Sequence, residues 1–278
     1  MTETAKKQVA KNEKKEVAQV QLNAILKSEP LSVREAEDYA IPYLNMLSKG
    51  SPQVDEENSE KFIKGAKKGQ IFNTVTERCS DVLTVLPVYF RRRYVEWYND
   101  RTKNKAPISE YLPEEFQAFQ KDGKIVRGED KKDRFVGKPD TYVENTAEHY
   151  VIVIDGQSWY KALIKMKGSQ LKKSKQWNSV MSNQRRVDGN DIYQPKDFAM
   201  SYNLSGKPEK NDQGSWHGWL ISQNKWVDEL GLAKLEDILA DAMQFEKDIH
   251  SGELKVAPQE DETSSPQGES SQSGDIPF

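Results

Sequence analysis

Residues 82–98 read Val-Leu-Thr-Val-Leu-Pro-Val-Tyr-Phe-Arg-Arg-Arg-Tyr-Val-Glu-Trp-Tyr. β-Branched and aromatic residues dominate this stretch, a composition that favours a β-strand over a helix. A segment of the same character, Ile71–Val75, precedes it, and polar residues around Glu77–Asp81 separate the two. We therefore expect a β-hairpin here, with a second strand that is unusually long.

The rest of the chain alternates between strand-like and helix-like segments. Strand character returns at Tyr150–Asp155, Trp159–Met166, Phe198–Leu204 and Trp216–Ser222, with a turn at Gly156-Gln157 after the first of these. Helices are expected around Glu114–Phe119, from an N-cap at Ser169 to about Asn183, and from Asp228 to about Ile249. No βαβ alternation is visible. The sequence therefore predicts a mainly β protein, an antiparallel barrel of the oligonucleotide-binding (OB) type with insertions and flanking helices, and a β-sandwich is the alternative.

Composition divides the chain into three parts. Residues 1–58 are rich in Lys, Glu, Gln and Ala and are expected to form a disordered or weakly helical extension and linker. Residues 59–252 hold the predicted strands and form the expected body, in which residues 99–147 are a polar, extended insertion. Residues 253–278 contain six acids, one lysine and one aromatic residue. Such a tail buries too little apolar surface to offset the entropy of ordering it, so it is expected to be disordered.

The net charge of −3 hides a strong segregation of charge along the chain. Residues 61–210 contain 29 Lys and Arg against 19 Asp and Glu, whereas the rest of the chain contains 12 against 25. A basic body with an acidic tail indicates a polyanionic partner for the body. A merely solvated charged surface is the alternative, but it does not predict the asymmetry.

Residues 89–98 form the densest aromatic and basic segment. On a strand, alternation sends Tyr89, Arg91, Arg93 and Trp97 to one face, and Arg92 and Tyr94 to the other. This mixture is typical of sites for single-stranded nucleic acid, because the bases stack on aromatic rings while basic side chains bind the phosphates. The alternative is that half of these rings belong to the core.

A second candidate segment crosses an expected junction between a strand and a helix. It supplies Trp159, Lys161, Lys165, Lys167, Lys172, Lys173, Lys175 and Trp177. These two segments together are the predicted nucleic-acid site, although Trp177 is as well suited to packing on the sheet. Trp216, His217 and Trp219 form a third cluster that we expect to be structural.

The chain closes on Asp275-Ile276-Pro277-Phe278, an apolar end to an acidic segment. This ending resembles the tip of bacterial single-stranded DNA-binding proteins, whereas Ser273 and Gly274 stand where that family continues with aspartates. The resemblance implies that the four residues dock replication, recombination and repair proteins. The segments Ala162–Met166 and Leu171–Asn178 also resemble replication-region proteins of tailed phages.

Catalytic motifs are sparse. His149, His217 and His250 are far apart in sequence and Cys79 is the one cysteine, so metal-ligand spacing is missing, as is a phosphate-binding glycine-rich motif. Among the scattered acids, Glu144, Asp155 and Asp188 are a conceivable two-metal nuclease set. We expect no enzyme, no cofactor and no metal. A single cysteine and the lack of long apolar segments suit a soluble protein of a reducing cytoplasm, that of a bacterial host if a phage encodes the chain.

These features predict a non-catalytic protein that binds and protects single-stranded DNA largely without sequence preference during phage DNA replication, recombination and repair. Its tip would recruit partner proteins. The alternatives are a single-strand annealing recombination protein and a metal-dependent nuclease that carries a docking tip. Whether the protein also binds RNA or forms a homo-oligomer stays open at this stage.

Overall fold

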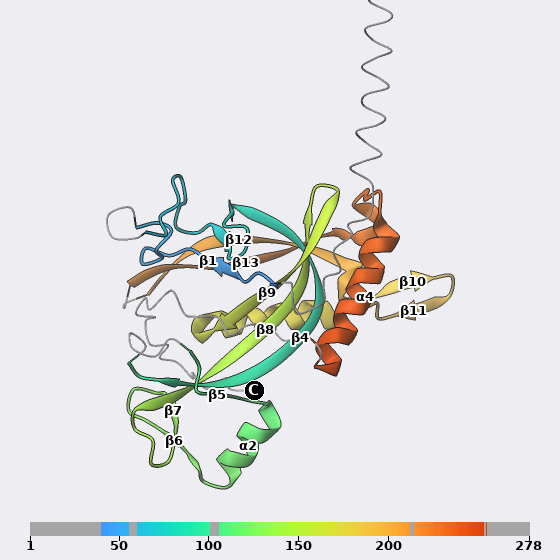
Figure 1. Cartoon of the computed structure of the whole chain (residues 1–278). Coiled ribbons are helices and arrows are strands. Elements are labelled where there is room, and N and C mark those ends of the chain that lie inside the picture. The colour runs from blue at the N-terminus through green and yellow to red at the C-terminus, as the bar shows by residue number, and fades with distance from the viewer. Residues whose placement is uncertain (1–39, 56–59, 101–105, 212–213, 253, 255–278) are drawn as a thin grey trace, which may run out of the picture. The chain divides into compact units, whose positions relative to one another are not determined.

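The computed structural model describes residues 40–55, 60–100, 106–211, 214–252 and 254, which are drawn in colour in Figure 1. The chain divides into residues 1–39 and 40–278, and all described residues belong to the second unit. Most of the expected extension and tail, including Asp275–Phe278, therefore lies outside the described residues.

The described part is mainly β. Its strands are β1 (Leu44–Met46), β2 (Ile71–Asn73), β3 (Cys79–Ser80), β4 (Val82–Tyr98), β5 (Ser109–Tyr111), β6 (Ile125–Arg127), β7 (Asp133–Phe135), β8 (Thr141–Asp155), β9 (Ser158–Lys167), β10 (Arg186–Asp188), β11 (Asp191–Tyr193), β12 (Met200–Asn211) and β13 (Gly214–Trp226). Its helices are α2 (Pro113–Lys121), α3 (Leu171–Ser182) and α4 (Leu235–Ser251), with 3-10 turns at Gly168–Gln170, Asp197–Ala199 and Val227–Glu229.

The two longest strands, β4 and β8, run antiparallel and form the spine of a curled half-barrel (Figure 1). Along one half of this pair, further strands bind both outer edges, in the order β13-β12-β4-β8-β9. Along the other half the order is β5-β4-β8-β7-β6. All of these pairings are antiparallel. The expected mainly β, antiparallel class is confirmed at this level.

A β-bulge explains how β4 runs unbroken through a proline. The register of β4 against β8 shifts between Pro87 and Tyr89. Proline has no N–H to donate to the ladder, so inside a sheet it is tolerated chiefly at edges and bulges. The bulge also bends its strand and increases the local twist, which contributes to the curl of the sheet.

The expected hairpin between Ile71–Val75 and the long strand is wrong. Strand β2 pairs instead with β1 and with the short β3. Strand β1 in turn lies beside β9, where the N–H of Leu163 donates to the carbonyl oxygen of Pro42 at 2.9 Å. The local partner of β2 is the two-residue β3 rather than the long strand, and its other edge pairs with β1, whose three residues are too short to show a strand pattern.

Three further boundaries differ from expectation. Residues 99–147 contain β5 to β7 and the start of β8 rather than only an irregular insertion. Helix α3 follows a 3-10 turn, and its N-cap is Gln170 rather than Ser169. Helix α4 begins at Leu235 rather than at Asp228. Gly231 has a left-handed backbone, with φ of 67°, which separates the helix from the 3-10 turn at Val227–Glu229. Helix α2 lies where it is expected, with Pro113 in its first turn and Lys121 in its last.

The sheet is covered on both faces, which explains the continuous apolar runs in β8 and β9. On the inner face, α3 contributes Trp177 and Met181 to a core with Val151, Ile164 and Met166. On the outer face, α4 packs its apolar stripe on the sheet. The buried members of that second core include Leu86, Tyr150, Ile152, Leu163, Ile238, Ala242, Phe245 and Ile249.

His149 on β8 connects α3 to the inner face of the sheet. Its Nε2 lies 2.8 Å from Oγ of Ser174, and its ring stacks on Trp177 with ring centres 4.5 Å apart. Burial disfavours the charged imidazolium and lowers the pKa of His149 to about 3. The residue is therefore a neutral, hydrogen-bonded part of the core.

We expect His149→Gln to remove a pH dependence from the free energy of unfolding. In the unfolded chain His149 gains its proton as the pH falls through about 6.5, whereas the folded protein resists protonation down to about pH 3. The unfolded state then binds more protons, so the wild type should lose about 2–3 kcal/mol between pH 7 and about pH 4.5 through this residue. Urea unfolding at both pH values, with wild type and variant side by side, measures the difference. Equal losses in the two proteins would contradict a neutral His149.

Candidate nucleic-acid interface

Cross-strand pairing shows which predicted residues share a face of the sheet. Tyr89 pairs with Tyr150, and Lys165 with Glu148, which in turn pairs with Arg91. Alternation along the three strands then defines the outer face, the one that packs against α4. This face holds Tyr89, Arg91, Arg93, Trp97, Trp159, Lys161, Lys165 and Lys167, whereas Arg92 and Tyr94 lie on the inner face.

Helix α4 occupies the part of the outer face where three of these residues lie. Nε1 of Trp159 donates to Oδ2 of Asp241 at 2.7 Å. Nζ of Lys161 lies 5.2 Å from the ring centre of Phe245, and the ring of Tyr89 meets that of His250 edge to face. These side chains hold the helix in place.

Ion pairs across β4, β8 and β9 engage three of the predicted cations. The nearly fully buried Glu148 accepts from Nε of Arg91 at 2.5 Å and lies 3.4 Å from Nζ of Lys165. Lys167 pairs with Glu144 at 3.3 Å. Burial alone would lower the pKa of Arg91, but the adjacent Glu148 outweighs it and raises the pKa. These cations tie the three strands together and are poorly available to phosphates.

Three of the predicted rings pack against other side chains. Trp177 is only 2% exposed, and Trp97 is buried with Val95 and Tyr142. Tyr94 stacks on Phe116 of α2, with ring centres 4.1 Å apart. Because a base needs a free ring face to stack on, Trp97 and Trp177 are corrected to core residues.

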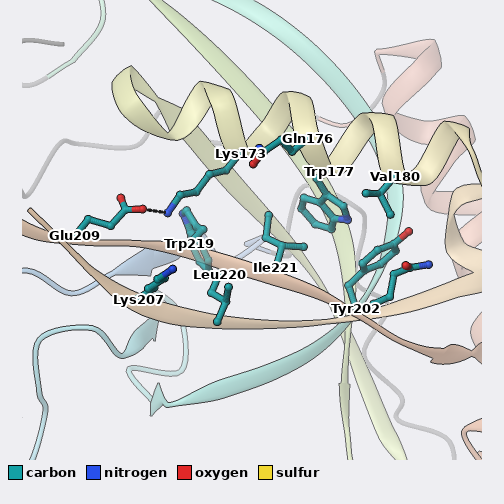
Figure 2. Close-up of a pocket in the computed structure, with 11 residues that line it drawn as sticks. Lys173, Gln176, Trp177, Val180, Tyr202, Lys207, Glu209, Trp219, Leu220 and Ile221 are labelled. Atoms are coloured by element: carbon teal, nitrogen blue, oxygen red, sulfur yellow. Dashed lines mark ion pairs between the residues drawn. The ribbon is translucent and has the colours of Figure 1, made fainter. Parts of the chain in front are cut away.

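A hollow lies between α3 and the hairpin of β12 and β13 (Figure 2). It has a volume of about 360 Å³. The aromatic side chains of Trp177, Tyr202 and Trp219 line it, together with Leu220 and Ile221. The remaining lining residues are Lys173, Gln176, Val180, Lys207, Glu209 and Gln223. We call this feature the α3 groove.

Glu209 joins the two walls of the α3 groove. It forms an ion pair with Lys173 of α3 (Figure 2) and accepts from Nε1 of Trp216 at 2.9 Å. Burial would raise the pKa of Glu209, but the bonds from Lys173 and Trp216 lower it overall. Gly218 makes this contact feasible, since a Cβ at that position would collide with both Glu209 and Lys173.

Exposed lysines remain on both walls of the α3 groove. Lys172 of α3 lies one helical turn before the lining residue Gln176, so it borders the opening, and Lys175 points further toward solvent. Lys207 of β12 lines the opposite wall and is exposed. None of these three forms an ion pair with another residue in the part of the chain that the structure describes. The groove therefore combines these three exposed lysines with an apolar floor, in which the rings of Trp177, Tyr202 and Trp219 are almost fully buried.

The sequence located the lysines of α3 but missed the other wall. Lys207 and Leu220 carry no local motif, and the cluster of Trp216 and Trp219 was expected to be structural. What brings these residues to α3 is the pairing of β12 with β4, whose partners are more than 100 residues apart. No signal in the sequence reveals a contact of that range.

The acids considered for a nuclease site do not meet. Glu144 and Asp155 lie on β8, eleven residues apart, which corresponds to roughly 35 Å along a strand. Asp188 belongs to the separate hairpin of β10 and β11. Within the described residues, no group of three His, Cys, Asp or Glu side chains is arranged to hold a metal ion. Nor does any described helix have the length and apolar character required to cross a membrane.

A comparison with models of protein families gives a match. No curated protein and no solved structure matches the chain. A family model described as "Pam3 phage gp34-like protein" matches residues 27–255, which include the whole sheet and all three described helices. The chain therefore belongs to the Pam3 phage gp34-like protein family.

Proposed function

We propose that this phage-family protein binds single-stranded DNA during phage DNA replication, recombination and repair, with the α3 groove as its binding site. One observation carries the proposal: exposed lysines on two opposed walls border a hollow whose floor is aromatic and aliphatic. Lys172 and Lys207 would bind the phosphates of the strand. Bases would lie against Leu220, the most exposed of the apolar residues that line the groove.

The chemistry of the groove favours a single strand without sequence preference. Its walls offer positive charge and apolar surface, which every nucleotide can use. A duplex hides the faces of its bases inside the stack and has less to gain from an apolar floor. Binding through lysines and phosphates releases counterions, so the affinity should fall steeply as salt rises.

We also infer that the curled sheet is an OB-type barrel with insertions. The strands β4, β8 and β9 are consecutive neighbours, α3 follows the third, and the hairpin of β12 and β13 returns to pair with β4. A three-strand meander, a helix and a returning hairpin is the order of a five-stranded OB barrel. Strand β1 lies beside β9, at the gap that closure would have to fill.

The proposal predicts that charge reversal at the groove weakens binding to oligo-dT. We expect Lys172→Glu and Lys207→Glu each to raise Kd at least tenfold, about 1.4 kcal/mol. Each should also reduce the salt dependence by about one counterion if its lysine contacts one phosphate. Fluorescence anisotropy with labelled oligo-dT at several salt concentrations gives both quantities.

Lys247→Glu is the matched control, because Lys247 is an exposed lysine on α4, away from the groove. It should change Kd by less than the groove variants and leave the salt slope unaltered. If all three reversals weaken binding equally, only net charge matters and the α3 groove is not the site. If the wild type does not bind oligo-dT, the proposed function itself is wrong.

We further propose that Ile276, Pro277 and Phe278 recruit partner proteins to the coated strand. The support lies in the sequence, where an apolar trio follows an acidic, Ser- and Gly-rich segment. A phenylalanine side chain buried in a partner's pocket contributes about 1.5–3 kcal/mol by its area alone. Proline restricts the backbone beforehand and lowers the entropy lost on docking.

The double change Pro277→Gly and Phe278→Ala should abolish recruitment and leave the affinity for oligo-dT within about twofold of wild type, a difference below ~0.5 kcal/mol. The measurement is a pull-down from phage-infected host extract, with each protein loaded on immobilised single-stranded DNA. Ser271→Ala, in the same tail, serves as the control. Identical partner sets for wild type and the double variant would show that the trio recruits nothing.

A further inference from the structure

The hairpin of β10 and β11 exposes an apolar pair. Val187 and Ile192 are 68% and 72% exposed, more than any other large hydrophobic side chain that the structure describes. They are direct cross-strand partners, so the two side chains lie next to each other on one face of the hairpin. Contiguous exposed apolar surface marks contact sites, whereas single exposed hydrophobic residues are normal.

The opposite face of the hairpin is anchored to the body. Arg186 and Tyr193 are the next cross-strand pair, so their side chains point away from Val187 and Ile192. Nη2 of Arg186 donates to Oδ2 of Asp228 at 2.8 Å, and its guanidinium lies 4.7 Å from the ring centre of Trp226. The apolar pair therefore faces outward, on a hairpin that projects from the rest of the fold (Figure 1).

The outer edge of β10 has no strand paired with it in the part of the chain that the structure describes. The hairpin is a two-stranded sheet, and no described strand pairs with its other edges. Its loop is Gly189-Asn190, and Gly189 has φ of 59°, as the first central residue of a type II′ turn requires. In such a loop Asp188 and Asp191 form the hydrogen-bonded closing pair. The N–H and C=O of Val187 then point outward, away from β11 and into open solvent.

The charges on β10 are self-complementary. If two copies of β10 pair antiparallel on a two-fold axis at Val187, Arg186 of each copy, which also bonds to Asp228 of its own chain, lies opposite Asp188 of the other. Opposite charges directly across a strand pair stabilise the sheet, and like charges destabilise it. The same register joins the two apolar pairs into one continuous patch. A nucleic acid is a poor occupant of this surface, because the exposed Asp188 and Asp191 would repel its phosphates.

We propose that two copies of this chain associate through β10, edge to edge and antiparallel, with Val187 on the two-fold axis. The outward N–H and C=O groups of the two Val187 residues bond each other, and four aliphatic side chains cover one face of the resulting four-stranded sheet. This surface is far smaller than the interfaces of stable dimers, so the association is weak and reversible.

Disulfide trapping in the full-length chain tests this register. In a Cys79→Ser background, Val187→Cys places two thiols across a hydrogen-bonded pair with Cα atoms ~5.5 Å apart, within reach of a disulfide. Ile192→Cys is equally exposed, but its two copies would be separated by three strand spacings, ~14 Å. Under mild oxidation we expect at least ten times more covalent dimer from the first variant than from the second. Equal trapping at both positions, or none at 187, would overturn the proposal.

Charge reversal in the Val187→Cys background tests whether the partner at this edge is a second copy of the chain. Asp188→Arg sets arginine against arginine across the axis, and Arg186→Asp sets aspartate against aspartate, so each alone should trap at least five times less dimer. An equal mixture of the two variants restores both opposite-charge pairs and should restore trapping. Restoration also shows that the Arg186→Asp hairpin still folds without its bond to Asp228. If the mixture traps no more than the single variants, the occupant of this edge is not a second copy.

Discussion

The antiparallel pairing of β4 with β8 is the constraint on which the other elements depend. It runs from Thr84 opposite Ile154 to Tyr98 opposite Thr141, interrupted by the bulge at Pro87. A slip of β4 by one residue would turn Arg91 into the inner core, away from Glu148, and move Phe90 to the outer face. The alternation of charged and apolar residues therefore fixes the register. The register in turn decides where α3, α4, β9 and β12 can dock.

Buried carboxylates determine which cations are free. Glu148 engages Arg91 and Lys165 on the outer face. Glu96 is fully buried and accepts from Oη of Tyr111 at 2.8 Å, Nζ of Lys138 at 3.0 Å and Oγ1 of Thr141 at 3.0 Å. Removing one partner of such a set would leave a buried charge unpaired, at a cost of about 3–5 kcal/mol. The positive excess counted along the sequence thus overstates the positive charge that is free of ion pairs at the surface.

Local pattern sufficed for the long strand, for α2 and for the lysine-rich helix, because strand propensity, caps and composition act within a few residues. It did not reveal the partner of β2 or the far wall of the α3 groove, because both arise from pairings between distant segments. The rings of Trp97 and Trp177 show the same limit. Alternation along a strand gives the face on which a side chain lies, but only packing decides whether that face is open to a ligand.

The two proposed surfaces are linked along the chain, since only residues 183–185 separate α3 from β10. Association through β10 would therefore place two α3 grooves in one assembly, related by the two-fold axis. Two strand-binding sites in one assembly are what a single-strand annealing protein needs, one of the alternatives that the sequence leaves open.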